Sequence, residues 1–213
     1  MDIQGLEPSE PVTVVGVEQT IDDSMQPQLE VLQSKAEAWG KKVRDGFIPC
    51  KLAWTGFCTM LWPALRYPLP ATTFTEQEGE EITKQLYKSI LPTLGAARTF
   101  PLVYRFAPEC LQGFGLPHVY VEQEIAHISN LLVHGAIGTL QGDMMTANLE
   151  QAQLEVGIRI RLFKASFEHF GFLLTDCLVK SLWKFVSEFG IVLHLPEYLV
   201  PELQRENDFF LIE

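Results

Sequence analysis

The sequence predicts a mainly α-helical fold, an irregular multi-helix bundle with at most one or two short strands near the N-terminus. Apolar residues recur every three or four positions through most of the 213 residues, and this is the period of an α-helix. Residues typical of helix caps and helix ends flank these periodic segments. β-Branched residues, by contrast, are concentrated in one short run at residues 12–17.

The segments fall into four predicted regions. Residues 1–11, with prolines among acids, form a flexible acidic lead-in. Residues 12–91 form a first helical part, and residues 92–117 form a connection rich in proline and glycine. Residues 118–213 form a C-terminal helical part, which we expect to pack with residues 12–91 as one unit. With 47% apolar residues, the chain can bury a sizeable core.

The first helical part starts with one short strand at residues 12–17, followed by a polar turn and then by the clearest helix, at residues 25–45. The last turns of this helix carry Lys41, Lys42 and Arg44, which complement the negative end of the helix dipole. Its apolar face is predicted to hold Leu29, Leu32, Ala36, Trp39 and Val43.

Two further helices are predicted within the same part. Pro49 opens the first, and its uncharged run at residues 52–65 predicts a helix that is buried on nearly all sides. Thr75 and Glu78 form a capping box that begins the second. The inner face of this second helix is predicted to hold Ile82, Leu86 and Ile90.

The chain beyond Pro92 is predicted to be mostly loop up to residue 117, with an extended piece at residues 102–106. A helix follows at residues 120–135, and another runs from 139 to 157 between a threonine cap and a glycine. The inward residues of this second helix are predicted to be Leu140, Met144, Ala147 and Leu154.

Two further helical stretches are predicted after residue 157. Residues 168–172 are aromatic and short, and Thr175 caps a last helix that ends at Gly190. The inner face of the last helix is predicted to hold Leu178, Leu182 and Phe185.

Sequence composition indicates the cellular compartment in which we expect the protein. The first ten residues are polar and acidic, so we expect no secretory or mitochondrial signal. The longest uncharged run is shorter than the ~20 residues that a membrane helix needs. These features predict an intracellular protein, cytoplasmic or nuclear, without a membrane role. The cysteines lack Cys-x-x-Cys spacing and are predicted to be reduced and packed in the core: Cys50, Cys58, Cys110 and Cys177.

The net charge of −11 lies in the two ends of the chain. Residues 1–34 contribute −7, residues 35–195 sum to zero and residues 196–213 contribute −4. The chain therefore lacks the overall basic excess of a dedicated nucleic-acid binder. Small basic clusters do occur, and ordinary solvated faces are the favoured interpretation of them: Lys41, Lys42 and Arg44; Arg159, Arg161 and Lys164; Lys180 and Lys184.

Two groups of residues invite a metal hypothesis. Glu124, His127 and His134 can share one helical face, as in di-iron bundle proteins. That site needs a second Glu-x-x-His pair, so histidines hydrogen-bonded to their neighbours are the favoured interpretation. Asp22 and Asp23 are adjacent acids, and a solvated turn or helix cap is favoured for them over a polymerase-type metal pair. We therefore predict neither a metal site nor a cofactor.

Motifs of the common catalytic classes are absent from the sequence. There is no Gly-x-Ser-x-Gly elbow, Walker loop, Gly-x-Gly-x-x-Gly or His-Glu-x-x-His. The sequence thus offers no complete catalytic constellation, and we expect that the chain alone is not an enzyme.

Several phrases, taken in order, resemble the region that follows the palm in reverse transcriptases of microalgal retroelements. The resemblance covers about residues 12–213. The phrases that carry it are Val15-Gly16-Val17, QLEVLQSKAEAWGKKVRDG at 28–46, YPLPA at 67–71, TEQE at 75–78, Leu91-Pro92, QGFGL at 112–116, VEQEIAHISNLLVH at 121–134, residues 139–149, LEVG at 154–157, residues 175–185 and REND at 205–208.

This resemblance implies a thumb and C-terminal region without the polymerase palm. The family's metal-binding aspartates lie upstream of the position that matches Gly16, so no catalytic residue carries over to this chain. The thumb of that family follows a template-primer backbone, which makes Lys41, Lys42 and Arg44 the candidate nucleic-acid contacts.

Three functional hypotheses follow. The first is an inert fragment of a retroelement reverse transcriptase with at most weak nucleic-acid contact. The second is a helical module that binds a protein partner, or a second copy of itself, through exposed apolar surface. The third is a metal-dependent helical enzyme that uses Glu124 and His127.

Overall fold

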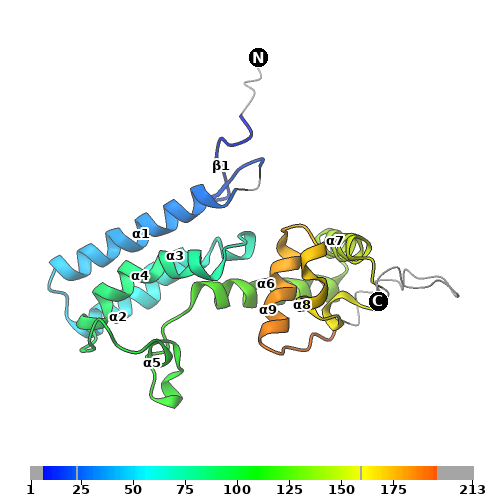
Figure 1. The fold of residues 1–213 in the computed structure, drawn as a ribbon. Coiled ribbons are helices and arrows are strands. Elements are labelled where there is room, and N and C mark those ends of the chain that lie inside the picture. The colour runs from blue at the N-terminus through cyan, green and yellow to red at the C-terminus, as the bar shows by residue number, and fades with distance from the viewer. Residues whose placement is uncertain (1–6, 23, 159, 196–213) are drawn as a thin grey trace, which may run out of the picture. The chain divides into compact units, whose positions relative to one another are not determined.

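The computed structural model describes residues 7–22, 24–158 and 160–195. It confirms the mainly α-helical fold with a small sheet near the N-terminus (Figure 1). The chain divides into two compact units, residues 1–123 (unit 1) and residues 124–213 (unit 2). The division falls inside helix α6 (Val119–Ile137), beyond the connection at residues 92–117. The packing of both helical parts as one unit stays a prediction.

Unit 1 begins with a two-stranded antiparallel hairpin instead of one strand. Strands β1 (Val12–Val14) and β2 (Val17–Gln19) pair with Val14 opposite Val17. Val15 and Gly16 form the turn at φ of 50° and 82°. Positive φ at both central residues suits a tight hairpin, so the predicted single strand is split in the middle. Gln28 of α1 (Gln26–Asp45) fixes the hairpin, because its Oε1 accepts the Glu18 N–H at 2.7 Å.

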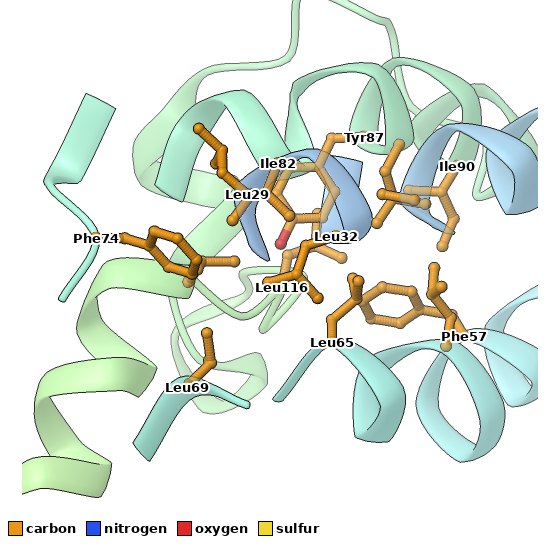
Figure 2. Packing of buried hydrophobic residues seen from close by; sticks show 14 of the residues in the cluster. Leu29, Leu32, Phe57, Leu65, Leu69, Phe74, Ile82, Tyr87, Ile90 and Leu116 are labelled. Atoms are coloured by element: carbon orange, nitrogen blue, oxygen red, sulfur yellow. The ribbon is translucent and has the colours of Figure 1, made fainter. Parts of the chain in front are cut away.

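Helices α1 and α4 (Glu76–Thr93) supply much of the core of unit 1. The predicted inner residues of both helices are buried, except Trp39, which is partly buried against the same core. The capping box is confirmed, since Thr75 N–H donates to Glu78 Oε2 at 2.8 Å and Glu78 N–H donates to Thr75 Oγ1 at 3.3 Å. Figure 2 shows side chains from these helices and from the segment after Pro49 pointing toward one another.

The segment after Pro49 forms three pieces: α2 (Cys50–Gly56), the π-helix η1 (Phe57–Leu61) and α3 (Trp62–Arg66). Pro63 explains the π-helix. Its ring would clash with the carbonyl four residues earlier, and the wider turn relieves that clash. The prediction of burial on nearly all sides is wrong. Ala53, Phe57, Leu61 and Leu65 are buried, but the outer side carries exposed Leu52 and Met60.

The connection at residues 92–117 contains more helix than predicted. Helix α4 continues through Pro92 to Thr93, and residues 102–106 form helix α5 (Leu102–Phe106), not an extended piece. Pro101 starts this helix, since its carbonyl accepts the N–H groups of Tyr104 and Arg105. The remaining pieces of unit 1 are short 3-10 turns: η2 (Leu69–Ala71) and η3 (Glu109–Leu111).

Unit 2 contains most of α6, then α7 (Leu140–Val156), η4 (Leu162–Lys164), α8 (Phe167–Phe170), η5 (Gly171–Leu173) and α9 (Leu178–Glu188). The ends of α7 are as predicted. Thr139 Oγ1 accepts the Gly142 N–H at 3.2 Å, and Gly157 closes the helix at a φ of 72°. Thr175 does not cap α9. Its N–H donates to Glu155 Oε1 at 2.8 Å, and Cys177 occupies the cap position.

The predicted inner face of α7 is wrong. Leu140, Met144, Ala147 and Leu154 are all exposed, and the opposite side is buried through Gly142, Leu149, Ala152, Gln153 and Val156. Helix α6 also exposes apolar residues within unit 2. Glu124, His127 and Leu131 are buried there, whereas Ile125 and Leu132 are exposed.

The four cysteines are free and exposed, so their predicted packing in the core is wrong. Burial, with a smaller contribution from the charge of Glu109, raises the pKa of the Cys58 thiol. Among the described residues, no helix is long and apolar enough to cross a bilayer.

Candidate functional site

The three predicted nucleic-acid contacts all lie exposed near the end of α1. Lys41 and Arg44 are three residues apart and share one side of the helix, while Lys42 lies about a quarter turn from Lys41 and nearly opposite Arg44. Arg44 Nε donates to Asp45 Oδ1 at 3.2 Å, and both side chains are more than half exposed. The remaining guanidinium N–H groups of Arg44 carry further donor capacity.

The end of α4 lies beside the end of α1. A Cβ atom on Gly40 would meet Ser89 Oγ at 3.2 Å and Leu86 Cα at 3.6 Å, so the two backbones approach closely there. Further along, Val43 and Arg44 share a hollow with Ser89, Pro92 and Thr93. Residue numbers therefore rise together along both helices, which run parallel and end on the same side of unit 1 (Figure 1).

This parallel arrangement gathers positive charge. Residues 41–48 and 88–98 carry five bases and one acid, Asp45. The first turns of α4, by contrast, carry Glu76, Glu78, Glu80 and Glu81 without a base. We call this region the basic end of unit 1, comprising Lys41, Lys42, Arg44, Lys88 and Arg98.

A hollow of about 390 Å³ opens at the basic end. Arg44 and Arg98 contribute to its lining, together with Phe47. Phe47 is 93% exposed at a φ of 49°, an unusual position for a large aromatic ring. Cationic side chains beside an exposed aromatic ring are the components that proteins use to hold single-stranded nucleic acid.

The helix ends themselves oppose anion binding here. The C-terminal ends of α1 and α4 carry the negative part of the helix dipole, which the nearby cations partly neutralise. Any affinity for phosphate at the basic end therefore depends on side-chain charges alone. This limits the expected strength of the contact.

The other basic clusters are smaller. Arg161, Lys164 and Lys184 are exposed in unit 2, and Lys180 Nζ lies 2.8 Å from Asp176 Oδ1 in an ion pair. Arg159 lies outside the described residues. Arg161 and Lys164 line a hollow in unit 2, but among the described residues no aromatic side chain as exposed as Phe47 lines it with them.

The Glu124 and His127 pair is buried in unit 2. His127 Nδ1 lies 3.4 Å from Glu124 Oε2, and Ser181 Oγ donates to Glu124 Oε1 at 2.7 Å. His134 does not join them, because its Nδ1 contacts Thr139 Oγ1 at 3.1 Å. No three His, Cys, Asp or Glu side chains converge as metal ligands within the part of the chain that the structure describes.

The predicted turn at residues 22–24 has the geometry of a local hydrogen-bonded turn. Ser24 N–H donates to Asp22 Oδ1 at 3.2 Å and to Thr20 Oγ1 at 2.9 Å. Hydrogen bonds from the Thr20 hydroxyl and then from the Ser24 backbone lower the pKa of Asp22. Asp23 lies outside the described residues.

Sequence reasoning missed Phe47, Lys88 and Arg98 at the basic end. One signal was available, because α4 and its continuation change from acidic at residues 76–81 to basic at residues 84–98. Their proximity to Lys41 and Arg44 depends on the parallel packing of two helices, which no local pattern specifies.

Comparison of the chain with protein-family models, curated proteins and solved structures gives no match in any of the three.

Proposed function

We propose that this chain is a non-catalytic helical module that contacts a nucleic-acid backbone weakly through the basic end of unit 1. The observation that carries the proposal is the hollow lined by Arg44, Arg98 and exposed Phe47, with Lys41 three residues before Arg44 on the same side of α1. The resemblance to the post-palm region of a retroelement reverse transcriptase points in the same direction. It implies a surface that follows a template-primer duplex without performing chemistry.

The expected affinity is low for an electrostatic reason. The chain carries a net charge of −11, which repels a polyanion, and the basic end offers only a few cations. Non-specific contacts of this kind have dissociation constants on the order of 10⁻⁵ M at physiological salt. The affinity must also fall as salt rises, because bound phosphates release their counterions.

A salt-dependent binding titration tests the proposal. Fluorescence anisotropy is measured with a labelled template-primer and a labelled single strand, for the full chain and for a Lys41→Ala, Lys42→Ala, Arg44→Ala variant. We expect the variant to bind about tenfold more weakly and its salt slope to fall by about 2. The matched control removes the same charge from unit 2: Arg161→Ala, Lys164→Ala and Lys184→Ala.

Equal losses in both triple variants would show that net charge, not the basic end, governs binding, and would overturn the proposal. Magnesium-dependent primer extension by the purified chain would overturn its non-catalytic part. The coding sequence immediately upstream tests the ancestry, since an in-frame palm with an aromatic-x-Asp-Asp hairpin is expected there.

A second candidate function is protein interaction, and one observation favours it. Helix α7 exposes an apolar stripe at heptad-like spacing, formed by Leu140, Met144, Ala147 and Leu154. Exposed apolar stripes of this kind often mark association surfaces. Sedimentation analysis of the full chain and of Met144→Glu tests it, with Met60→Glu on the exposed side of η1 as the control. A concentration-independent monomer contradicts it.

A further inference from the structure

Phe47 has a backbone conformation that is unfavourable for a phenylalanine. Its φ of 49° lies in the left-handed region, which favours glycine, while the neighbouring Gly46 has an ordinary φ of −87°. The ring is almost fully exposed, so burial in the core of unit 1 does not offset this conformation. Strain at a residue whose side chain gains nothing from burial is a reason to look for a function of the ring.

The Phe47 ring lies at the hollow that Arg44 and Arg98 also line, and no aspartate or glutamate lines it among the described residues. The backbone that carries Arg98 is held in place by Arg105. Arg105 Nε donates to the Phe100 carbonyl at 2.6 Å, and Arg105 Nη2 donates to the Arg98 carbonyl at 3.2 Å. The hollow therefore presents an exposed aromatic surface beside two cations.

The hydroxyl groups of the hollow limit what it can bind. Ser89 Oγ donates to the Gln85 carbonyl at 3.1 Å, and Thr93 Oγ1 donates to the Ser89 carbonyl at 3.2 Å. Each hydroxyl has one proton, so neither can donate to a phosphate at the same time. A free phosphate would meet only guanidinium donors, whereas a ligand with both a phosphate and an aromatic face would also use the ring.

We propose that the hollow holds an unpaired nucleotide of a single strand, with its base stacked on the Phe47 ring and the adjoining phosphates beside Arg44 and Arg98. This inference rests on the proposed function and names the form of nucleic acid that the basic end takes. In a duplex the neighbouring base pairs cover the faces of each base, so a side chain beside the backbone cannot stack on them. Every unpaired base exposes such a face, so we expect little preference for sequence.

The test compares two single strands that carry the same number of phosphates, an oligothymidine and an abasic strand of the same length. Each is labelled with fluorescein, and the full chain is titrated into it at low salt while the anisotropy is measured. We expect the wild-type chain to bind the oligothymidine about tenfold more tightly, which is the size of effect that stacking of one base produces.

Three variants sharpen the result. Phe47→Ala removes the ring, so it should bind both strands equally, and its affinity for a blunt duplex should equal that of the wild-type chain. Phe47→Trp keeps an aromatic ring and should keep the preference. Phe172→Ala is the control, because Phe172 in unit 2 is also largely exposed but does not line this hollow, so the tenfold preference should remain.

The contrary outcomes separate this inference from the proposed function. Equal affinity of the wild-type chain for the two strands, or a preference that survives Phe47→Ala, overturns the stacking and leaves the backbone contact in place. Polyglutamate that displaces the oligothymidine as efficiently as the unlabelled strand does, at equal charge, also overturns it, because charge alone would then account for binding. Absence of salt-dependent binding to every strand overturns the proposed function as well.

Discussion

Helices α4 and α7 begin with the same kind of cap, but the buried face was predicted correctly only for α4. Each starts at a threonine cap, and they have similar lengths of 18 and 17 residues. The predicted inner residues of α4 are all buried, whereas those of α7 are all exposed. Cap and period therefore locate a helix along the chain without deciding which of its sides faces the core.

The outer side of each helix explains the difference. The outer side of α4 carries Glu80, Glu81, Lys84 and Lys88, and charge cannot be buried there without a partner. Helix α7 has apolar residues on both sides, so either side could enter the core. The side with Gly142 and Ala152 is the buried one, and small residues there permit close packing.

The inversion of α7 gives the prediction with the largest expected effect. Leu149→Asp places a charge on the buried side and should lower the free energy of unfolding by more than about 4 kcal/mol. Met144→Asp places the same charge on the exposed side and should change it by less than about 0.5 kcal/mol. Urea unfolding is followed by the far-ultraviolet circular dichroism of the helices. A larger loss for Met144→Asp than for Leu149→Asp would show that the inner face of α7 is the one predicted from the sequence.

The next prediction concerns a buried amide that no periodic pattern identifies. Gln123 Oε1 accepts from Thr72 Oγ1 and from the Phe74 N–H, each at 2.9 Å, and its Nε2 donates to the Phe74 carbonyl at 3.0 Å. Gln123→Ala removes this partner from the Phe74 N–H and carbonyl, while Thr72 Oγ1 keeps the Leu69 carbonyl at 3.1 Å, and should cost about 2 to 3 kcal/mol. Gln85→Ala, on the exposed side of α4, is the matched control. Equal chemical-denaturation midpoints for the two variants would contradict this account.

The caps of α4 and α7 should contribute equally to stability, although the buried face was predicted correctly for α4 and wrongly for α7. Thr75→Ala and Thr139→Ala each remove a side-chain acceptor from the first turn and should each cost about 1 kcal/mol. Thr→Ser at either site keeps the acceptor and should be nearly neutral. Thermal unfolding measures all four variants. A cost at Thr75 alone would mean that the Thr139 cap contributes nothing to α7.

Local chemistry in the sequence accounts for what could be predicted. The capping box at Thr75, the inner face of α1 and the glycine end of α7 all depend on neighbouring residues, and all are confirmed. The hairpin turn at Val15 and the exposed thiols depend on tertiary context, and so does the burial of Glu124 beside Ser181. For the same reason the sequence indicated Lys41 and Arg44 as candidate nucleic-acid contacts but could not predict that Arg98 lies at the same end of unit 1.

The smallest expected effect comes from a half-buried histidine, His118. Burial, partly opposed by the charges of Glu76 and Glu80, lowers the pKa of His118 below its ordinary value of 6.5. The unfolded chain therefore binds more protons than the folded chain just below pH 6.5, so stability is lost as the pH falls from that value. His118→Phe keeps an aromatic ring beside Phe106 and should make this loss shallower, as measured by urea unfolding between pH 7.5 and pH 5 in steps of about half a unit. An unaltered profile in His118→Phe would mean that His118 titrates in the folded chain as it does in the unfolded one.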